Sequence, residues 1–347
     1  MEQKKKQVLK IAFLDFWEGA NISEIISFLH LDEYDLIEDY DNPDLVIYSC
    51  FGERHLDYLH CKLLFFCAEN VVPDFNTCDY AISTLRIQYA DRNLWIPYAH
   101  FASLTQTPTI LESGAEITNR KFCSFIYSQD HIGKGAKLRK EFCQQLMNNY
   151  KTVDCPGKIL NNMHSSLLAK RDNASDWHNS KIRFLNGYKF NIAFENSDAP
   201  GYITEKLIDC YIANTVPIYW GSNGDIAPYP KESIICANDY ESVEALIERI
   251  KEVDSNDALY LSILRANPFS VDKINKIPNF AAQIHDFIEK IINAEQETKG
   301  HVLWADSTRY AHYKQEHKKK HIRFAIKIAN LAGRVIKKLS FLSKNIN

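Results

Sequence analysis

The stretch FENSDAPGYITEK, from Phe194 to Lys206, separates two segments of different character. Residues 189–194 form the apolar run of a buried strand, residues 207–213 have apolar helical spacing, and residues 216–220 form another strand-like run. This order of a strand, a polar loop with Gly and Pro, a helix and a second strand predicts a βαβ unit. Ligands bind such units where the first strand ends and the helix begins, because free backbone N–H groups and the positive end of the helix dipole meet there.

The charged start of that helix has two interpretations. Lys206 in its first turn would suit an anionic ligand such as a diphosphate. Thr204 and Glu205, however, are also ordinary residues at a helix N-terminus, and a lysine there is often simply solvated. The spacing alone leaves both open.

The rest of the chain extends this pattern into two domains, which suits a length of 347 residues. Apolar strand-like runs alternate with helical ones, which indicates parallel α/β sheets. Residues 103–119, rich in Ser, Thr, Gln, Pro and Gly, read as a linker. The predicted strands are Val8–Asp15, Asp44–Ser49, Leu63–Cys67, Tyr80–Ser83 and Phe122–Tyr127, and the predicted helices are Asn21–Leu29, Lys137–Tyr150 and Val243–Val253.

The stretch from Phe194 to Gly221 resembles the signature of the family 10 glycosyltransferases, the α-1,3/1,4-fucosyltransferases: F-E-N-S, a spacer, Y-[VI]-T-E-K, an apolar helix and V/I-P-[VI]-Y-W-G. Similar blocks run through most of residues 8–270. The resemblance implies a GT-B-like fold of two Rossmann-like domains facing across a cleft. We expect an N-terminal acceptor-side domain with linker at 1–119, a GDP-fucose-binding domain at 120–300, and a basic amphipathic tail at 301–347.

The same resemblance implies an inverting enzyme that moves L-fucose from GDP-β-L-fucose to a GlcNAc- or LacNAc-type acceptor in α-1,3 or α-1,4 linkage, in Lewis-antigen or O-antigen (lipopolysaccharide) synthesis. Such a displacement needs a base for the acceptor proton and a cationic clamp for the departing GDP. Two alternatives stay open: another nucleotide-sugar donor on the same fold, or an inactive, membrane-attached glycan-binding relative.

Glu69 is the candidate general base. It directly follows the apolar run 63–66, at the carboxyl end of a predicted strand, and CAENVVPDFN is similar to the family block G-E-N-x-x-P-[DN]-F-N, whose Glu is the proposed base. Ala68 replaces the usual Gly. Glu69 would otherwise only satisfy backbone groups in a loop, and Asp74 is a rival carboxylate that better suits a turn after Pro73.

The resemblance also assigns the donor site. Lys206 would hold the diphosphate, Glu205 would accept hydrogen bonds from fucose hydroxyls, and Asn196 and Tyr202 would line the pocket. Arg139, on the helix after the first strand of the second domain, is a further phosphate candidate, although an arginine there is often a surface residue.

One position departs from the family pattern. Some bacterial relatives place an Arg for the diphosphate where this chain has Leu160, just before Asn161. Lys158 is the candidate substitute, and the alternative is that the role is absent.

No metal or other cofactor is expected. The only D-x-D, Asp39 to Asp41, lies in an acidic turn, and the twelve histidines form no close ligand cluster. In a GT-B enzyme the helix dipole and a lysine take the place of the ion.

The tail has a different composition from the body. Residues 314–344 carry ten of the 41 Lys and Arg residues but one acidic residue, which leaves 31 basic and 43 acidic residues elsewhere. An apolar stripe at helical spacing predicts an amphipathic helix that binds an anionic membrane surface; packing on the protein's own body, disorder and nucleic-acid binding are the alternatives, the last of them the weakest. The stripe consists of Phe324, Ile328, Leu331, Val335, Leu339 and Leu342.

The expected location is the cytoplasmic face of a bacterial inner membrane, as a peripheral protein. The nine cysteines are an odd number without C-x-x-C pairing, which favours reduced thiols. No run reaches the roughly 18 apolar residues of a membrane span. The expected partners are GDP-fucose, an N-acetyllactosamine-type or lipid-linked glycan and the membrane surface, with no nucleic acid.

Overall fold

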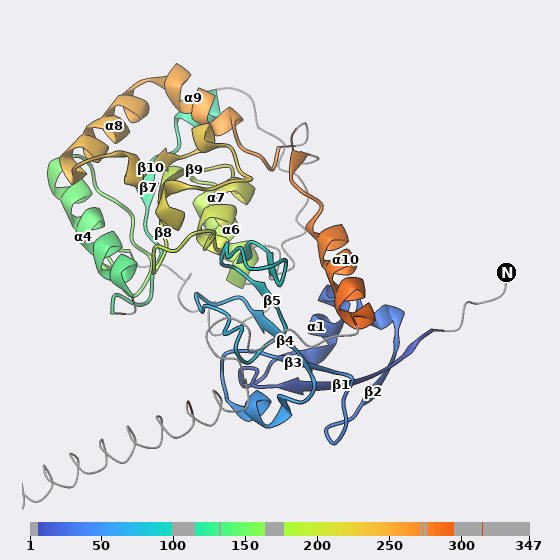
Figure 1. Cartoon of the computed structure of the whole chain (residues 1–347). Helices are drawn as coiled ribbons and strands as arrows, with labels where there is room; N and C mark the ends of the chain where they lie inside the picture. Colours follow the sequence, from blue (N-terminus) through green and yellow to red (C-terminus); the bar gives the residue numbers. More distant parts are fainter. Residues whose placement is uncertain are drawn as a thin grey trace, which may run out of the picture.

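The computed structural model describes residues 6–98, 115–131, 133–163, 177–270, 273, 276–294 and 314. They form two α/β units, each built on a parallel sheet (Figure 1). This agrees with the two Rossmann-like domains expected from the sequence.

The first sheet has the strand order β2-β1-β3-β4-β5-β6, with every pair parallel. Its central strands are apolar on both faces because helices or loops cover both sides, whereas the two edge strands are only partly buried. The strands are β1 (Val8–Leu14), β2 (Asp35–Glu38), β3 (Leu45–Tyr48), β4 (Lys62–Cys67), β5 (Tyr80–Ser83) and β6 (Asn93–Trp95).

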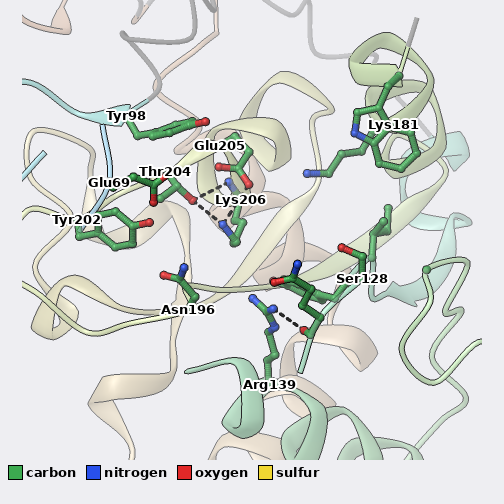
Figure 2. A pocket seen from close by; sticks show the side chains of 15 residues that line it. Glu69, Tyr98, Ser128, Arg139, Lys181, Asn196, Tyr202, Thr204, Glu205 and Lys206 are labelled. Carbon is green, nitrogen blue, oxygen red and sulfur yellow. Dashed lines mark hydrogen bonds and ion pairs between the residues drawn. The ribbon is translucent and has the colours of Figure 1, made fainter. Parts of the chain in front are cut away.

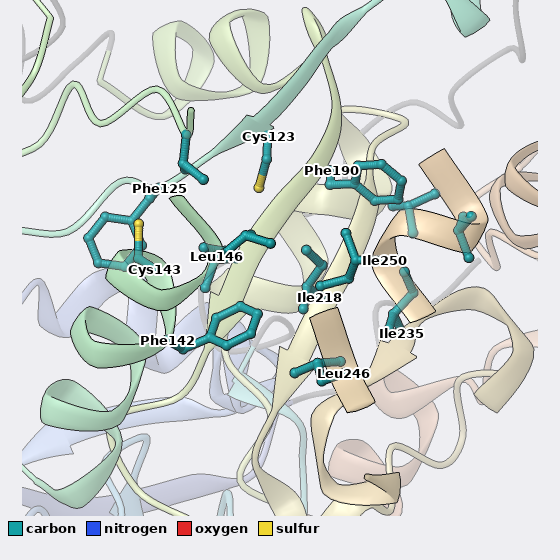
Figure 3. Close-up of a cluster of buried hydrophobic side chains, with 14 of the residues drawn as sticks. Cys123, Phe125, Phe142, Cys143, Leu146, Phe190, Ile218, Ile235, Leu246 and Ile250 are labelled. Carbon is teal, nitrogen blue, oxygen red and sulfur yellow. The ribbon is translucent and has the colours of Figure 1, made fainter. Parts of the chain in front are cut away.

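The second sheet has the order β10-β9-β8-β7 and is also parallel. All seven side chains of β8 are buried. A core of aromatic and aliphatic side chains fills the space between this sheet and its helices (Figure 3). The strands are β7 (Lys121–Ser124), β8 (Tyr188–Phe194), β9 (Val216–Trp220) and β10 (Ile235–Cys236).

Helices connect the strands and cover the sheets. The α-helices are α1 (Ile22–Phe28), α3 (Ala115–Thr118), α4 (Lys134–Asn149), α6 (Trp177–Leu185), α7 (Glu205–Ile212), α8 (Val243–Ser255), α9 (Asp257–Arg265) and α10 (Phe280–Asn293). Short 3₁₀ turns fill several connections: η1 (Leu31–Glu33), η2 (Arg54–Tyr58), η4 (Ser222–Gly224), η5 (Lys231–Ser233) and η6 (Ala237–Asp239).

Helix α10 lies with the first sheet although it follows the second one in the chain. Its buried face, including Ile284 and Ile288, packs into the same core as β1, β3 and β4. In Figure 1 it lies beside α1, away from the helices of the second unit. The Nζ of Lys62 on β4 donates to the carbonyls of Ile291 and Ala294, at 2.7 Å each, which satisfies free carbonyls at the end of α10. A division by core, rather than by chain position, therefore assigns the last part of residues 120–300 to the first unit.

Several expectations fall on residues outside the described part of the chain. These are most of the linker at 103–119 and nearly all of the tail at 301–347, including its apolar stripe. Lys314 is described, and its Nζ contacts the carboxylate of Asp74 at 2.5 Å. Among the described residues, none of the helices has the length and apolarity needed to cross a bilayer. All nine cysteines are free thiols, and eight of them are buried.

Candidate active site

The β8–α7–β9 unit is built around a carboxylate that is completely buried. Glu195 follows β8, and its two oxygens accept hydrogen bonds from the backbone N–H and the hydroxyl of Thr204, at 2.8 and 2.7 Å. Thr204 is the N-cap of α7. The loop between β8 and α7 is thus closed at its base, which fixes where the helix begins.

Lys206 lies between two carboxylates. Its Nζ is 3.4 Å from Glu195 and 3.0 Å from Glu205, and it also donates to the Thr204 hydroxyl at 3.0 Å. Burial alone would lower the pKa of Lys206, but Glu205 and Glu195 raise it well above its usual value. Burial likewise favours a neutral Glu205, yet Lys206 and Lys181 bring its pKa down to about 2. The site therefore holds an ammonium and a carboxylate side by side at neutral pH.

These residues line a cavity of about 500 Å³, within the usual size range of small-molecule sites. Both units contribute to it: Glu69 and Tyr98 come from the first, and the other lining residues come from the second. Figure 2 shows Glu69, Tyr98 and Tyr202 at one end, and Lys181 and Ser128 at the other. The lining consists of Glu69, Tyr98, Ile126, Tyr127, Ser128, Gln129, Arg139, Gly157, Trp177, Lys181, Asn196, Tyr202, Thr204, Glu205 and Lys206.

Arg139 reaches the cavity from α4 as a nearly buried cation, with 5% of its surface exposed. Its guanidinium stacks 3.8 Å from the ring centre of Tyr127 and donates to the carbonyl of Gln129 at 2.8 Å. Its Nε has no hydrogen-bond partner among the described residues. A buried donor left unpaired costs free energy, so this guanidinium is prepared for an acceptor such as a phosphate oxygen.

Lys181 is a third cation at the cavity. It lies on α6, one turn after Trp177, so both side chains project from one face of that helix. Its Nζ contacts Asp209 at 2.6 Å, and the other oxygen of Asp209 is 2.9 Å from His178. Asp209 thereby holds Lys181 at the cavity wall.

Glu69 differs from these buried groups because its side chain is exposed at the cleft. Its backbone is fixed: its N–H lies 3.4 Å from the Cys67 sulfur, and its carbonyl accepts from the Thr84 hydroxyl at 3.2 Å. Its carboxylate has no ion-pair or hydrogen-bond partner in the described part of the chain. A free carboxylate on a fixed backbone is suited to accept a proton.

The structure brings together six of the seven predicted site residues. Lys158 is the exception: its side chain is exposed and does not line the cavity. Gly157 occupies the wall instead, packed so closely on Tyr127 that a Cβ would lie 2.4 Å from the Tyr127 carbonyl oxygen. Leu160 packs against the hydrophobic core. The second lysine at the cavity is Lys181, not Lys158.

Two protein-family models match this chain. Residues 11–102 match the model of the α-(1,3)-fucosyltransferase FucT N-terminal domain, and residues 118–297 match that of the glycosyltransferase family 10 (fucosyltransferase) C-terminal region. The chain belongs to glycosyltransferase family 10.

Individual relatives in family 10 have moderate sequence identity to this chain. The chain is 27% identical to an α-(1,3)-fucosyltransferase FucT of Helicobacter pylori over 78% of its own length and 62% of that protein's. It is 32% identical to a putative fucosyltransferase of Acanthamoeba polyphaga mimivirus over 59% and 36%. The chain thus spans less than two thirds of these relatives. A crystal structure of an α1,3-fucosyltransferase with GDP-fucose is similar at a TM-score of 0.66 and 25% identity, covering 86% of this chain and 94% of the other.

Hydrogen bonds between the two units of this family 10 protein were not predicted from the sequence. The loop that precedes α7 bonds directly to the first unit: the Arg86 N–H donates to the Pro200 carbonyl at 2.9 Å, and the Trp95 indole donates to Gly201 at 3.0 Å. Gly201 has φ +83°, and a Cβ there would lie 2.6 Å from the Trp95 nitrogen. The first unit therefore holds the loop that carries Tyr202.

Several lining residues were also missed from the sequence. Ser128 and Gln129 lie in the loop after β7, four and five residues past the end of the strand. The rule that places ligands at the carboxyl ends of parallel strands could have found them. Trp177 and Lys181 lie on a helix with no predicted counterpart. Glu195 belongs to the quoted motif but received no role, because its total burial is a property of the folded loop.

Proposed function

We propose that this protein is an inverting α-1,3-fucosyltransferase that moves L-fucose from GDP-β-L-fucose to a GlcNAc- or LacNAc-type acceptor. The observation that carries the proposal is the cavity itself, with three cations along its walls and the free carboxylate of Glu69 at one end. The neighbouring structure that holds GDP-fucose supports the choice of donor. For the linkage, the support is the α-1,3 activity named for the relatives.

In the proposed reaction Glu69 accepts the proton of an acceptor hydroxyl, and the hydroxyl oxygen attacks C1 of fucose. The bond between C1 and the phosphate oxygen breaks on the opposite face, so β-linked donor gives α-linked product. The electron pair leaves with GDP, which gains negative charge on its terminal phosphate.

That charge has cationic partners in the cavity. Arg139, with an unpaired Nε, and Lys206 with the N-terminus of α7 would stabilise the departing diphosphate. Lys181 would add a third cation in place of the arginine absent at Leu160. Glu205, ionised beside Lys206, would accept hydrogen bonds from fucose hydroxyls.

A donor panel tests this assignment. The full chain is incubated with N-acetyllactosamine and, in parallel, GDP-fucose, GDP-mannose, UDP-galactose or UDP-N-acetylglucosamine. We expect GDP release and a fucosylated product from GDP-fucose alone. Transfer from another donor would replace the assignment, and saccharide binding without transfer from any donor would favour an inactive glycan-binding protein.

The biological setting belongs to the same proposal: a Lewis-antigen or O-antigen glycan as acceptor, at the cytoplasmic face of the inner membrane, with the basic tail on anionic lipid. Cosedimentation with vesicles containing phosphatidylglycerol, but not with pure phosphatidylcholine vesicles, would support it. Equal recovery with both vesicle types would contradict it.

Metal independence is proposed as well. The described residues hold no group of three or more His, Cys, Asp or Glu side chains placed to bind an ion. The transfer rate should therefore stay unchanged in EDTA, and a loss restored by Mg²⁺ or Mn²⁺ would contradict this part.

A further inference from the structure

Two cysteines lie side by side where β3 and β4 reach the carboxyl edge of the first sheet. Tyr48 and Phe65 are register partners in these parallel strands, and their ring centres are 5.4 Å apart. Cys50 and Cys67 come two residues after these partners, and both contact the hydrophobic cluster on the same face of the sheet. Neighbouring strands are about 4.8 Å apart, within the Cα separation of about 4.4–6.8 Å that a disulfide requires.

The chain stays extended beyond the last residue of β3, which brings Cys50 level with the end of β4. The N–H of Ser49 donates to the Leu14 carbonyl at 3.2 Å, and the N–H of Phe51 donates to the Asp15 carbonyl at 3.0 Å. Alternate residues thus bond towards β1, as they do in a parallel strand. Cys50, between them, therefore keeps the register with β4.

The two thiols contact each other and differ in exposure. The Cys67 thiol donates a hydrogen bond to the Cys50 sulfur, which lowers the pKa of Cys50, a partly exposed residue. Cys67 is 1% exposed, and its hydrogen bond to Cys50 together with burial raises its pKa. Because the thiolate is the reactive form of cysteine, Cys50 is the nucleophile of this pair and Cys67 is the thiol held next to it.

Cys67 also contacts the proposed base. Its sulfur accepts a hydrogen bond from the N–H of Glu69 at 3.4 Å, and only Ala68 separates the two residues in the chain. A bond from the Cys67 sulfur to Cys50 would change this contact and move the backbone that carries Glu69. A misplacement of about 1 Å can cost about 10²-fold in rate.

A second pair of thiols shows that proximity alone does not make such a pair reactive. The sulfur atoms of Cys143 and Cys155 are 3.9 Å apart, but neither residue has exposed surface. Cys143 lies inside the core of the second unit (Figure 3). An oxidant in water can reach the edge of the first sheet through Cys50, whereas it cannot reach this core. Exposure therefore distinguishes the two pairs.

We propose that Cys50 and Cys67 are a redox modification site, at which a small-molecule disulfide such as glutathione disulfide joins the two sulfurs reversibly and thereby lowers fucose transfer. The Cys50 thiolate attacks one sulfur of the oxidant and releases one glutathione. The Cys67 sulfur then attacks the Cys50 sulfur, and the second glutathione leaves with the Cys67 proton. Two protein thiols are oxidised to one disulfide, and one glutathione disulfide is reduced to two thiols. The effect on transfer rests on the proposed function, but the disulfide itself does not.

The first test maps the disulfide, so it does not depend on catalysis. The reduced full chain is incubated with glutathione disulfide and unfolded, its free thiols are alkylated, and its peptides are identified by mass spectrometry. We expect a link between Cys50 and Cys67, with Cys143 and Cys155 alkylated as free thiols.

The second test compares activity before and after oxidation. Fucose transfer to N-acetyllactosamine should fall about ten-fold or more and return after dithiothreitol, with the affinity for GDP unchanged. Cys50→Ala should transfer fucose at the wild-type rate and should not respond to the oxidant. Cys143→Ala, in the buried pair, is the matched control and should lose activity on oxidation as the wild type does.

The absence of a link, a reaction that stops at a mixed disulfide on Cys50, or an equally rapid link between Cys143 and Cys155 would overturn the proposal. Undiminished transfer by the linked chain would overturn it too, as would a loss of activity in oxidised Cys50→Ala, because another group would then be responsible. A chain that forms the Cys50–Cys67 link but transfers no fucose even when reduced would contradict the proposed function and leave the modification site standing.

Discussion

Lys206 and Glu195 show how a residue outside the cavity sets the chemistry inside it. Glu195 has no exposed surface and does not line the cavity, yet it holds the Thr204 cap and lies 3.4 Å from the Lys206 ammonium. Burial raises the pKa of Glu195. Its charge is tolerated because Lys206 and the Thr204 donors compensate it.

Removing the lysine should therefore destabilise the fold as well as weaken donor binding. Lys206→Met leaves Glu195 buried without its cation, and we expect a loss of about 3 kcal/mol in the free energy of unfolding, measured by urea denaturation. Lys231→Met removes an exposed pair with Asp239 and should cost less than about 1 kcal/mol. Equal losses in the two variants would contradict this account of Glu195.

Because the pKa of Glu205 is low in the folded protein, we predict that the free energy of unfolding depends on pH. Its pKa falls from 4.5 to about 2 on folding, so its charge adds stability that is fully present above pH 4.5 and lost as the pH falls towards 2. The difference in unfolding free energy between wild type and Glu205→Gln should be constant from pH 8 to 5 and shrink below pH 4.5. A difference that grows on acidification would have the wrong sign.

At the scale of elements, the loop before α7 is the joint between the two units. Its carbonyls bond to Arg86 and Trp95, and Gly201 fits where no side chain could. The loop that carries Tyr202 is thus positioned by the unit that carries Glu69, the proposed base. A change in this contact should affect transfer through geometry, without touching a reacting group.

Two glycines test this joint. Both Gly201 and Gly19 have φ near +80°, but a Cβ at Gly19 meets nothing within 4 Å, whereas one at Gly201 overlaps Trp95 and Arg86. Gly19→Ala should cost about 1–2 kcal/mol for backbone strain alone. Gly201→Ala should cost about 1–3 kcal/mol more and should lower transfer activity. Thermal unfolding and fucose transfer measure both effects, and equal behaviour of the two variants would argue against a tight joint.

The elements that the sequence predicted are those with a strong local pattern. Buried strands such as β3 and β8 are continuous apolar runs, so periodicity finds them. The edge strands β2 and β6 are only partly buried and carry no such run, and they were not predicted. Within the site, motif residues such as Glu69 and Lys206 were identified, whereas Lys181 was not, because its place at the cavity depends on how α6 packs against α7.

For the whole molecule, the crossing of α10 onto the first sheet could not be read from the chain order. An amphipathic helix after the second unit fits either core equally well by pattern. Packing decides it, since the buried side chains of α10 complete the core of β1, β3 and β4. The last described helix is therefore part of the fold of the N-terminal unit.

The contribution of α10 to the stability of the first unit is measurable. Ile288→Ala, on the buried face of α10, should lower the free energy of unfolding by about 2–5 kcal/mol, and Gln283→Ala on its exposed face should change it by less than about 0.5 kcal/mol. Hydrogen exchange should show the loss in strands β1, β3 and β4. Loss confined to the second sheet would show that α10 is not part of the first core.

The central claim, that the carboxylate of Glu69 takes the acceptor proton while the second unit holds the donor, is tested most directly by Glu69→Gln. We would measure fucose transfer to N-acetyllactosamine and, separately, the affinity for GDP-fucose. The account predicts a loss of transfer of about 10²-fold or more with donor affinity unchanged. Transfer at the wild-type rate by Glu69→Gln would contradict it.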